Sequence, residues 1–311
     1  MPRALLTCLL MAAAGLHGCG GPTGLGSYGD GGWDGFSATD GEPNIKSGRM
    51  TEDEVWRGTI VVDGEVLAPE GVTLTIQAGA RVSFAEGVEP SSKIIVHGAL
   101  YAQGDFQTPV FFAGEPQSPE WHGILLEEGS VGRLAYAQLI GGKVHTRSAS
   151  TQVSYCQFTE NAGAALTIEG SNPTVEDSLF RRNVVGIRVI RQGAPDVMNN
   201  TLIGNVYGLV CDDGGQPTVD RNVIANNRED GILSRGASSP QVQNNNIIGN
   251  GGYAVKDGGR LLDNFIQGNN GLPPTAVEVG LSPQGGQVFG VEEVISTRSS
   301  PNSEAGERRF R

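Results

Sequence analysis

Three histidines recur at nearly constant spacing in the first half of the chain. His97, His122 and His145 are 25 and 23 residues apart. In a structure that repeats at this spacing they would stack about 5 Å apart, and imidazoles so placed could bind a borderline divalent metal ion. The alternative is that the three are surface histidines at corners, whose positions in their coils differ by one or two residues. We keep the three as metal candidates, and the sequence predicts no other cofactor.

Two adjacent carboxylates, Asp212 and Asp213, are the second candidate for chemistry. A suitably spaced pair of carboxylates can act as acid and base in glycoside hydrolysis. Adjacent residues of a strand point to opposite faces, however, and Asp-Asp-Gly-Gly is an ordinary turn sequence. Other carboxylates are scattered along the chain. We therefore assign no catalytic residue from the sequence.

Asparagine recurs at one position of a repeat, and its amides could either bind sugars or build structure. The column contains Asn161, Asn183, Asn205, Asn227 and Asn250. Asparagine tolerates the left-handed and bridge conformations of a sharp corner, and its amide can bond to the amides above and below it. We interpret the column as a structural ladder. A corner that is turned in five coils needs five such residues, whereas the binding of one ligand rarely needs five identical residues.

The repeat that positions these residues is about 22 residues long. Successive copies start at Thr151, Pro173, Pro195, Pro217 and Pro240. Two further columns are apolar: Val153, Val175, Val197, Val219 and Val242; and Phe158, Phe180, Leu202, Ile224 and Ile247. A period of this length indicates stacked units that contact only their neighbours.

Each unit alternates apolar and polar residues over three to five positions and then breaks at Gly, Asn, Asp or Pro. This pattern predicts several short strands per coil and no helix. Equivalent strands of successive coils would pair, and the two apolar columns would point inward as one long core. The 47 glycines of the 311 residues fit a chain that turns corners in every coil.

The chain resembles the right-handed parallel β-helix proteins of the pectate-lyase-like superfamily over roughly residues 56–270. The resemblance rests on the 22-residue repeat and on earlier motifs: Trp56-Arg-Gly, Gly71-Val-Thr-Leu-Thr-Ile-Gln-Ala-Gly79, Ile94-Ile-Val-His-Gly98, Pro109-Val-Phe-Phe and Trp121-His-Gly-Ile124. It implies an all-β, right-handed parallel β-helix solenoid of roughly nine coils.

The resemblance implies little about activity, because this fold carries lyases, hydrolases, epimerases, adhesins and proteins without catalysis. The hydrolases of the superfamily use Asn-Thr-Asp, paired Asp, Gly-His-Gly and Arg-x-Lys motifs. Only the aspartate pair occurs here. We therefore predict a non-catalytic scaffold or a protein that binds polysaccharide or another envelope component. The alternative is a carbohydrate-active enzyme, a lyase or a hydrolase, with an unrecognised site.

The N-terminus carries a second resemblance, to bacterial lipoproteins. Arg3 precedes an apolar run from Ala4 to Leu16 that is too short to span a bilayer. Leu16-His-Gly-Cys19 is similar to a lipobox, although His17 departs from the usual small or branched residue. The resemblance implies removal of residues 1–18, acylation of Cys19, and an outer-membrane protein held by its lipid anchor. Ordinary secretory cleavage and a fortuitous cysteine are the alternatives.

Composition divides the rest of the chain. Residues 19–50 are rich in glycine and predict a disordered tether, residues 51–295 a β-helix with terminal caps, and residues 296–311 a disordered tail. Within the β-helix, residues 288–295 form a last strand or a cap. The net charge of −12 argues against nucleic acid as a partner.

Besides Cys8 in the predicted signal segment and Cys19, the chain has two cysteines, and we predict no disulfide between them. Cys156 and Cys211 lie two coils and different columns apart, at least about 9 Å along the axis, which is beyond disulfide reach. Cys211 shares its column with the core position Val189. We expect both to be buried free thiols.

Overall fold

The computed structural model describes residues 44–85, 92–114, 121–270, 288–289 and 291–308. The chain divides into two compact units, residues 1–34 and 35–311, and all described residues belong to the second. The predicted signal segment, Cys19 and most of the predicted tether lie outside the described residues. No helix among the described residues has the length and apolarity needed to cross a bilayer.

The described strands form three faces, which we number in the order the chain visits them in each coil. Face I is an 11-stranded parallel sheet. Its strands are β2 (Glu54–Trp56), β4 (Thr73–Gln77), β7 (Ala99–Gln103), β10 (Val131–Ala135), β13 (Ser150–Ser154), β16 (Thr174–Glu176), β19 (Asp196–Met198), β22 (Thr218–Asp220), β25 (Gln241–Gln243), β28 (Arg260–Leu262) and β31 (Glu293–Val294).

Faces II and III together make a 20-stranded sheet, because the long strand β3 (Thr59–Ala68) runs through both and pairs with β1 (Asn44–Arg49). Face II continues with β5 (Arg81–Phe84), β8 (Val110–Gly114), β11 (Ala137–Ile140), β14 (Gln157–Thr159), β17 (Leu179–Arg181), β20 (Thr201–Ile203), β23 (Val223–Ala225), β26 (Asn246–Ile248) and β29 (Phe265–Gln267). Face III continues with β6 (Lys93–Val96), β9 (Trp121–Leu126), β12 (Gly142–Thr146), β15 (Ala164–Glu169), β18 (Val185–Ile190), β21 (Tyr207–Cys211), β24 (Ile232–Ser234), β27 (Val255–Lys256) and β30 (Val288–Phe289).

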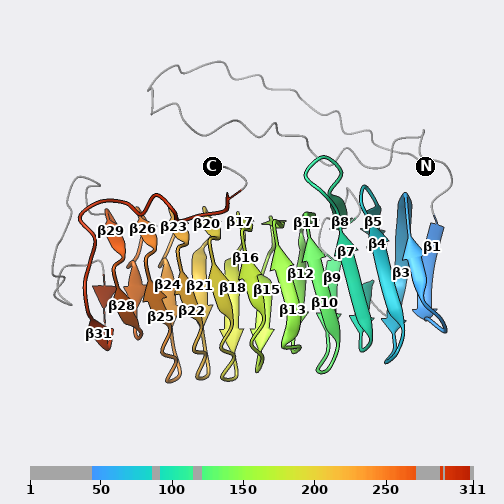
Figure 1. Cartoon of the computed structure of the whole chain (residues 1–311), viewed down its shortest axis with the longest axis horizontal. Coiled ribbons are helices and arrows are strands. Elements are labelled where there is room, and N and C mark those ends of the chain that lie inside the picture. Colours follow the sequence, from blue (N-terminus) through green and yellow to red (C-terminus); the bar gives the residue numbers. More distant parts are fainter. Residues whose placement is uncertain (1–43, 86–91, 115–120, 271–287, 290, 309–311) are drawn as a thin grey trace, which may run out of the picture. The chain divides into compact units, whose positions relative to one another are not determined.

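Except at the two ends of each face, every described strand pairs in parallel with the equivalent strand one coil before and one coil after (Figure 1). The result is an all-β, right-handed parallel solenoid of about nine turns, which confirms the predicted fold class. Strands β30 and β31 extend faces III and I by one more coil. Residues 288–295, predicted to be a last strand or a cap, thus contain two short strands on different faces.

The two apolar columns of the repeat build the core. Val175 pairs with Val153 and Val197, and Phe180 pairs with Phe158 and Leu202. Every residue of both columns is at most 1% exposed. The rings of Phe158 and Phe180 stack with centroids 4.8 Å apart, the spacing of paired strands. The prediction that these columns point inward was correct.

The asparagine column forms a continuous ladder at the corner between faces II and III. In each rung the side-chain Nδ2 donates to Oδ1 of the asparagine one coil later, at 2.7–3.1 Å. The same Oδ1 also accepts the backbone N–H of the earlier asparagine. The ladder runs from Asn161 to Asn269, one coil further than the sequence suggested.

A second ladder stands at the corner between faces I and II. Asn200, Asn222, Asn245 and Asn264 repeat the same side-chain bonds. Toward the N-terminus the ladder changes chemistry: Ser178 Oγ accepts the N–H of Cys156 at 3.1 Å. Cys156 and Cys211 are both buried, and burial raises the pKa of the Cys211 thiol.

Two predicted boundaries differ from the structure. Strand β1 pairs with β3 inside the segment 19–50 that composition assigned to a tether. Residues 296–308, predicted as part of a disordered tail, run back along face II, beside the edge formed by β29, β26, β23, β20 and β17 (Figure 1). This segment, which we call the strap, has no periodicity, so composition alone could not show that its polar residues find partners.

Individual strap residues bond to coils far earlier in the chain. Asn302 exchanges hydrogen bonds with Asn246 at 2.7 and 2.8 Å. The N–H of Gly306 donates to the carbonyl of Arg221 at 2.8 Å. At its end, Arg308 Nε donates to both oxygens of Asp177 at 2.8 and 2.9 Å. The strap therefore ties together coils that otherwise touch only their neighbours.

Candidate functional site

The structure does not bring the three candidate histidines together. His145 lies in the outward column of Leu125 on face III, whereas His97 falls two residues beyond the matching position of its own coil. The pairing of β9 with β12 shifts register between Gly142 and Val144, which displaces His122. The described residues contain no group of three or more His, Cys, Asp or Glu side chains that could hold a metal ion.

The two adjacent aspartates, Asp212 and Asp213, have different environments. Asp212 forms ion pairs with Arg188 at 2.9 Å and with Arg235 at 3.0 Å. Asp213 occupies the left-handed region at φ 53°. The pair thus belongs to a turn, as its sequence suggested, with one carboxylate held between two arginines.

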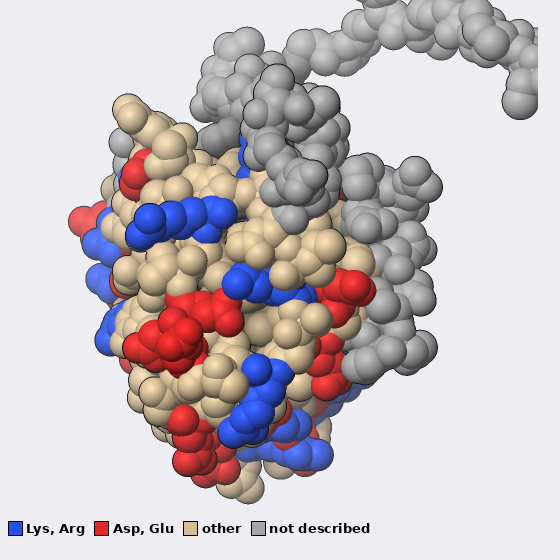
Figure 2. Space-filling model, turned by 90° about the vertical axis from the view of Figure 1, so that its right-hand side faces the viewer, with Lys and Arg blue, Asp and Glu red and all other residues tan. Residues whose placement is uncertain are grey.

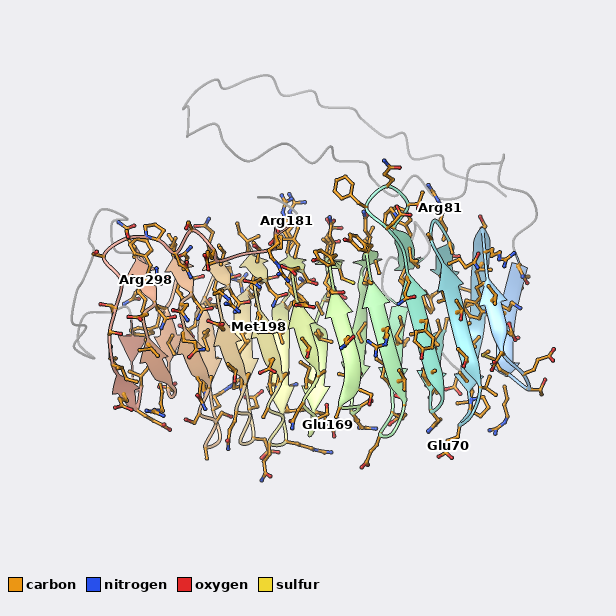
Figure 3. All side chains as sticks on the ribbon, in the orientation of Figure 1. Glu70, Arg81, Glu169, Arg181, Met198 and Arg298 are labelled. Carbon is orange, nitrogen blue, oxygen red and sulfur yellow. The ribbon has the colours of Figure 1, made fainter. Side chains whose placement is uncertain are left out.

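Glu169 is the centre of a second ionic cluster, at the edge where face III ends. Its carboxylate accepts from His145 Nε2 at 2.7 Å and from Arg147 Nε at 3.2 Å, and it also contacts Arg191. Burial alone would raise the pKa of Glu169, but the hydrogen bonds from His145 and Arg147 outweigh it, and the pKa lies below its usual range. Figure 3 shows Glu169 at the edge of the β-helix opposite Arg81 and Arg181 of face II.

Face III carries outward-pointing titratable residues in two columns. Register places five residues of successive coils in one outward column: Ala164, Val185, Tyr207, Asp230 and Tyr253. A parallel column contains Leu125, His145, Thr167, Arg188, Val210, Leu233 and Lys256. Proton donors, acceptors and cations therefore line one face along the direction of stacking.

Asp230 is the most unusual carboxyl group on this face. It is only 5% exposed, yet its nearest cation, Lys256 Nζ, is 3.8 Å from Oδ2. The backbone N–H of Tyr253 donates to Oδ1 at 2.8 Å. Burial raises the pKa of Asp230, and neither this hydrogen bond nor the charge of Lys256 fully offsets it. A buried carboxyl with a raised pKa beside a lysine is typical of acid–base sites.

A glycine makes this arrangement possible. A Cβ at Gly252 would lie 2.3 Å from Asp230 Oδ1, so any side chain at residue 252 would push the carboxylate away. Lys256 in turn lies over the ring of Tyr253, with Nζ 5.7 Å from the ring centroid. Tyr207 precedes Asp230 in the column. We call Asp230, Lys256, Tyr207 and Tyr253 the Asp230 cluster.

A hollow of about 300 Å³ lies on the same face, nearer the N-terminus. Its lining is His122, Gly141, Lys143, Asn161, Ala162, Gly163 and Ala164. His122 and Lys143 are exposed, and Lys143 makes no ion pair with any described residue. None of the described lining residues is a carboxylate. The described lining therefore carries the positive charge of Lys143, on a chain whose net charge is −12.

Small residues create the hollow. In the next coil the corresponding corner carries Val184 and Val185, whereas this corner carries Ala162, Gly163 and Ala164. One coil earlier, a single residue, Gly141 at φ 71°, turns the corner between β11 and β12. Both changes remove side-chain volume from the mouth of the hollow.

Sequence reasoning missed Asp230 and Lys143. One signal was available for Asp230: it directly precedes a glycine, as Tyr207 and His122 do in other coils. The burial of the carboxyl group and its distance to Lys256 depend on packing across coils, which no single repeat reveals. Lys143 lies in a coil whose length differs from the 22-residue repeat, so it aligns with none of the columns that the repeat defines.

Comparisons with known proteins agree with this architecture. A family model described as the right-handed beta helix region matches residues 121–270. Two structures of variants of the periplasmic alginate epimerase AlgG superpose with TM-scores of 0.55 and 0.51, at 13% and 16% sequence identity. They cover 76% and 78% of this chain and 78% and 75% of theirs.

The chain is a right-handed parallel β-helix. At such low identity the AlgG structures establish the fold alone. A search of curated proteins finds no match.

Proposed function

We propose that this chain is a carbohydrate-active protein that binds a polysaccharide along face III. The observation that carries the proposal is Asp230, a buried carboxyl with a raised pKa on an outward column beside Lys256. A raised pKa lies closer to neutral pH. A side chain whose pKa is near the pH of the solution both takes up and releases a proton efficiently.

The chemistry that this cluster suits best is proton removal next to a sugar carboxylate. Ionised Asp230 would take the proton from the carbon beside the carboxylate, and the positive charge of Lys256 would stabilise the negative charge that develops. A tyrosine hydroxyl of the Asp230 cluster could give a proton to the departing glycosidic oxygen. This is a lyase reaction. A hydrolase would need a second carboxyl group placed across the sugar.

The hollow supports an acidic polymer as the substrate. Lys143 lies on β12 and Asp230 four coils later, a separation of about 20 Å along the stacking direction. A polysaccharide lying along the column would span both. Lys143 and His122 would then bind a negatively charged substituent while the Asp230 cluster contacts another sugar.

The fold comparison guides the choice of polymer. The AlgG structures are of an alginate epimerase, so alginate is the first polymer to test, followed by polygalacturonate and an uncharged glucan. We expect binding to alginate or polygalacturonate that weakens with salt, as an electrostatic contribution should.

Two substitutions test binding at the hollow. Ala164→Val should fill it with the side chain that the next coil carries at Val185, and Lys143→Gln should remove its charge. Each should weaken binding of the acidic polymer about tenfold without lowering the melting temperature. Arg133→Gln on face I is the matched control and should bind as the wild type does. Equal binding by all four proteins would contradict the proposal.

A non-catalytic binding protein is the second candidate. The ion pairs of Asp212 and Glu169 favour it, because these carboxylates along face III are already held by arginines and a histidine. Binding that depends on Lys143, without any cleavage or epimerisation of the bound polymer, would support this candidate over the lyase.

We further propose that the protein is attached to the cell envelope by acylation of Cys19, with the membrane as partner through the lipid anchor. The supporting observation is the Leu16–Cys19 motif after a short apolar run. Cys19→Ser should abolish the mass increment of the lipid and move the protein from the membrane fraction to the soluble fraction. A wild-type protein without such an increment would overturn this proposal.

A further inference from the structure

Tyrosines replace aspartate, asparagine or arginine at one corner of two successive coils. At the corner between faces I and II, one residue per coil adopts the left-handed conformation. Later coils place Asp177, Asn199, Arg221, Asn244 and Asp263 there, whereas the two preceding coils place Tyr136 at φ 51° and Tyr155 at φ 54°. A bulky aromatic residue adopts this region less readily than asparagine does. The coil geometry alone therefore does not explain the choice of tyrosine.

The two tyrosines form an ordered aromatic platform. Their rings stack with centroids 4.7 Å apart and an angle of 7° between planes. Both side chains are half-buried. Burial raises the pKa of Tyr155, and the nearby negative charge of Asp177 acts in the same direction, so this phenol stays uncharged in neutral solution.

A third aromatic side chain stands at the same corner one coil earlier. Residues 104–109 replace the usual short turn with a loop whose Phe106 is 70% exposed. Asp105 fixes the loop by accepting from the N–H groups of Gln107 and Thr108, each at 2.8 Å. The start of the loop packs closely against the backbone of the next coil: the N–H of Gly104 donates to the carbonyl of Ala135 at 2.9 Å, and a Cβ at Gly104 would lie 2.6 Å from the carbonyl oxygen of Tyr136.

The surroundings of these rings are polar, and Arg133, which flanks them on face I, donates to Gln152. The flanking outward positions on faces I and II carry four glutamines: Gln103, Gln138, Gln152 and Gln157. The acidic groups nearby are already engaged, since Asp105 bonds within its loop and Asp177 pairs with Arg308. Amides beside a stacked aromatic platform match a ligand that offers hydroxyl groups and apolar C–H faces, and that carries no charge.

We propose that Phe106, Tyr136 and Tyr155 form a ridge that binds an uncharged oligosaccharide chain. The C–H groups on one side of a sugar ring are slightly positive and pack against the negative face of an aromatic ring. The glutamine amides can then donate to and accept from the sugar hydroxyls. The ridge lies at the corner of faces I and II, away from the outward columns of face III. It would bind a neutral glycan whether or not face III acts on an acidic one.

Another coil of the repeat shows which residue can replace tyrosine at this corner. Asn199 occupies the position of Tyr155 two coils later, at φ 54°. A Tyr136→Asn, Tyr155→Asn double variant therefore keeps a residue that suits the left-handed corner, and its melting temperature should be equal to that of the wild type or higher. Phe106→Ala removes an exposed ring without touching the corner.

The test is titration calorimetry of the purified protein with cellohexaose, mannohexaose and chitohexaose. We expect at least one of them to bind, and both variants to weaken that binding by roughly tenfold or more. Lys143→Gln, in the hollow of face III, should leave it unchanged. Failure of all three oligosaccharides to bind would overturn the proposal, as would binding unaffected by either variant.

Discussion

Arg308 binds Asp177 across 131 positions of sequence, with Nε 2.8 and 2.9 Å from the two carboxylate oxygens. The Asp177 side chain is fully buried and pairs with this arginine. The hydrogen bond to Asp177 is the main cause that raises the pKa of Arg308. The strap thus ends in an ion pair that fastens it to a coil near the middle of the β-helix.

Arg308→Ala should lower the free energy of unfolding by about 1–3 kcal/mol, because it leaves a buried carboxylate without its partner. Thermal and urea unfolding measure the change. Asp177→Asn should rescue the Arg308→Ala variant, since Asn199 holds the equivalent corner of the next coil. Arg228→Ala, whose side chain is 74% exposed, is the control and should change little. An additive double variant would mean that the pair does not couple.

The asparagine ladder should contribute to stability in proportion to the bonds that each rung makes. Asn205→Ala removes the acceptor of Asn183 and the donors to Asn227 and to the Phe180 carbonyl, and should cost about 1–3 kcal/mol. Asn161, at the end of the ladder, has a neighbour on one side only, so Asn161→Ala should cost less. Melting temperatures measure both. Unchanged stability with lost glycan binding would assign the column to a ligand instead.

The inward columns predict a severe effect for a buried charge. Leu202 is fully buried between Phe180 and Ile224, so Leu202→Asp should unfold at least the neighbouring coils. Circular dichroism and hydrogen exchange across these coils would measure the loss. A soluble variant with an unchanged spectrum and melting temperature would contradict the observed register.

The architecture was predictable because equivalent positions of successive repeats pair with one another, so the spacing of the repeat gives the strand register. Val175 and Phe180 recur one coil later as Val197 and Leu202, and each column could point only inward. The strap was not predictable in the same way, because Asn302 and Arg308 bond to coils far away in sequence. Asp230 combines both cases: its outward position follows from the repeat, whereas its burial depends on the residues packed around it.

Asp230 should make stability depend on pH in a defined direction. Its pKa in the folded protein is above the unfolded value of about 3.9, so the folded state holds the proton more tightly. The wild type therefore loses stability as the pH rises from about 4 through the folded pKa. Asp230→Asn lacks this loss. The two proteins should melt alike in acid, with the variant the more stable at neutral pH.

A pH series of melting temperatures measures this difference. The variant keeps an acceptor for the N–H of Tyr253, which makes it a close match in shape. A stability difference that grows as the pH falls would show that the folded pKa of Asp230 is lowered.

The most direct test of the account is turnover by the wild type and by Asp230→Asn on alginate and polygalacturonate, followed by absorbance of unsaturated products and by NMR of the polymer. We predict that the wild type cleaves at least one of them. Asp230→Asn should slow cleavage by about 10²–10⁴-fold while still binding the polymer. A wild type that modifies neither polymer, or an Asp230→Asn protein with undiminished activity, would contradict the assignment of Asp230 as the proton-transfer group of face III.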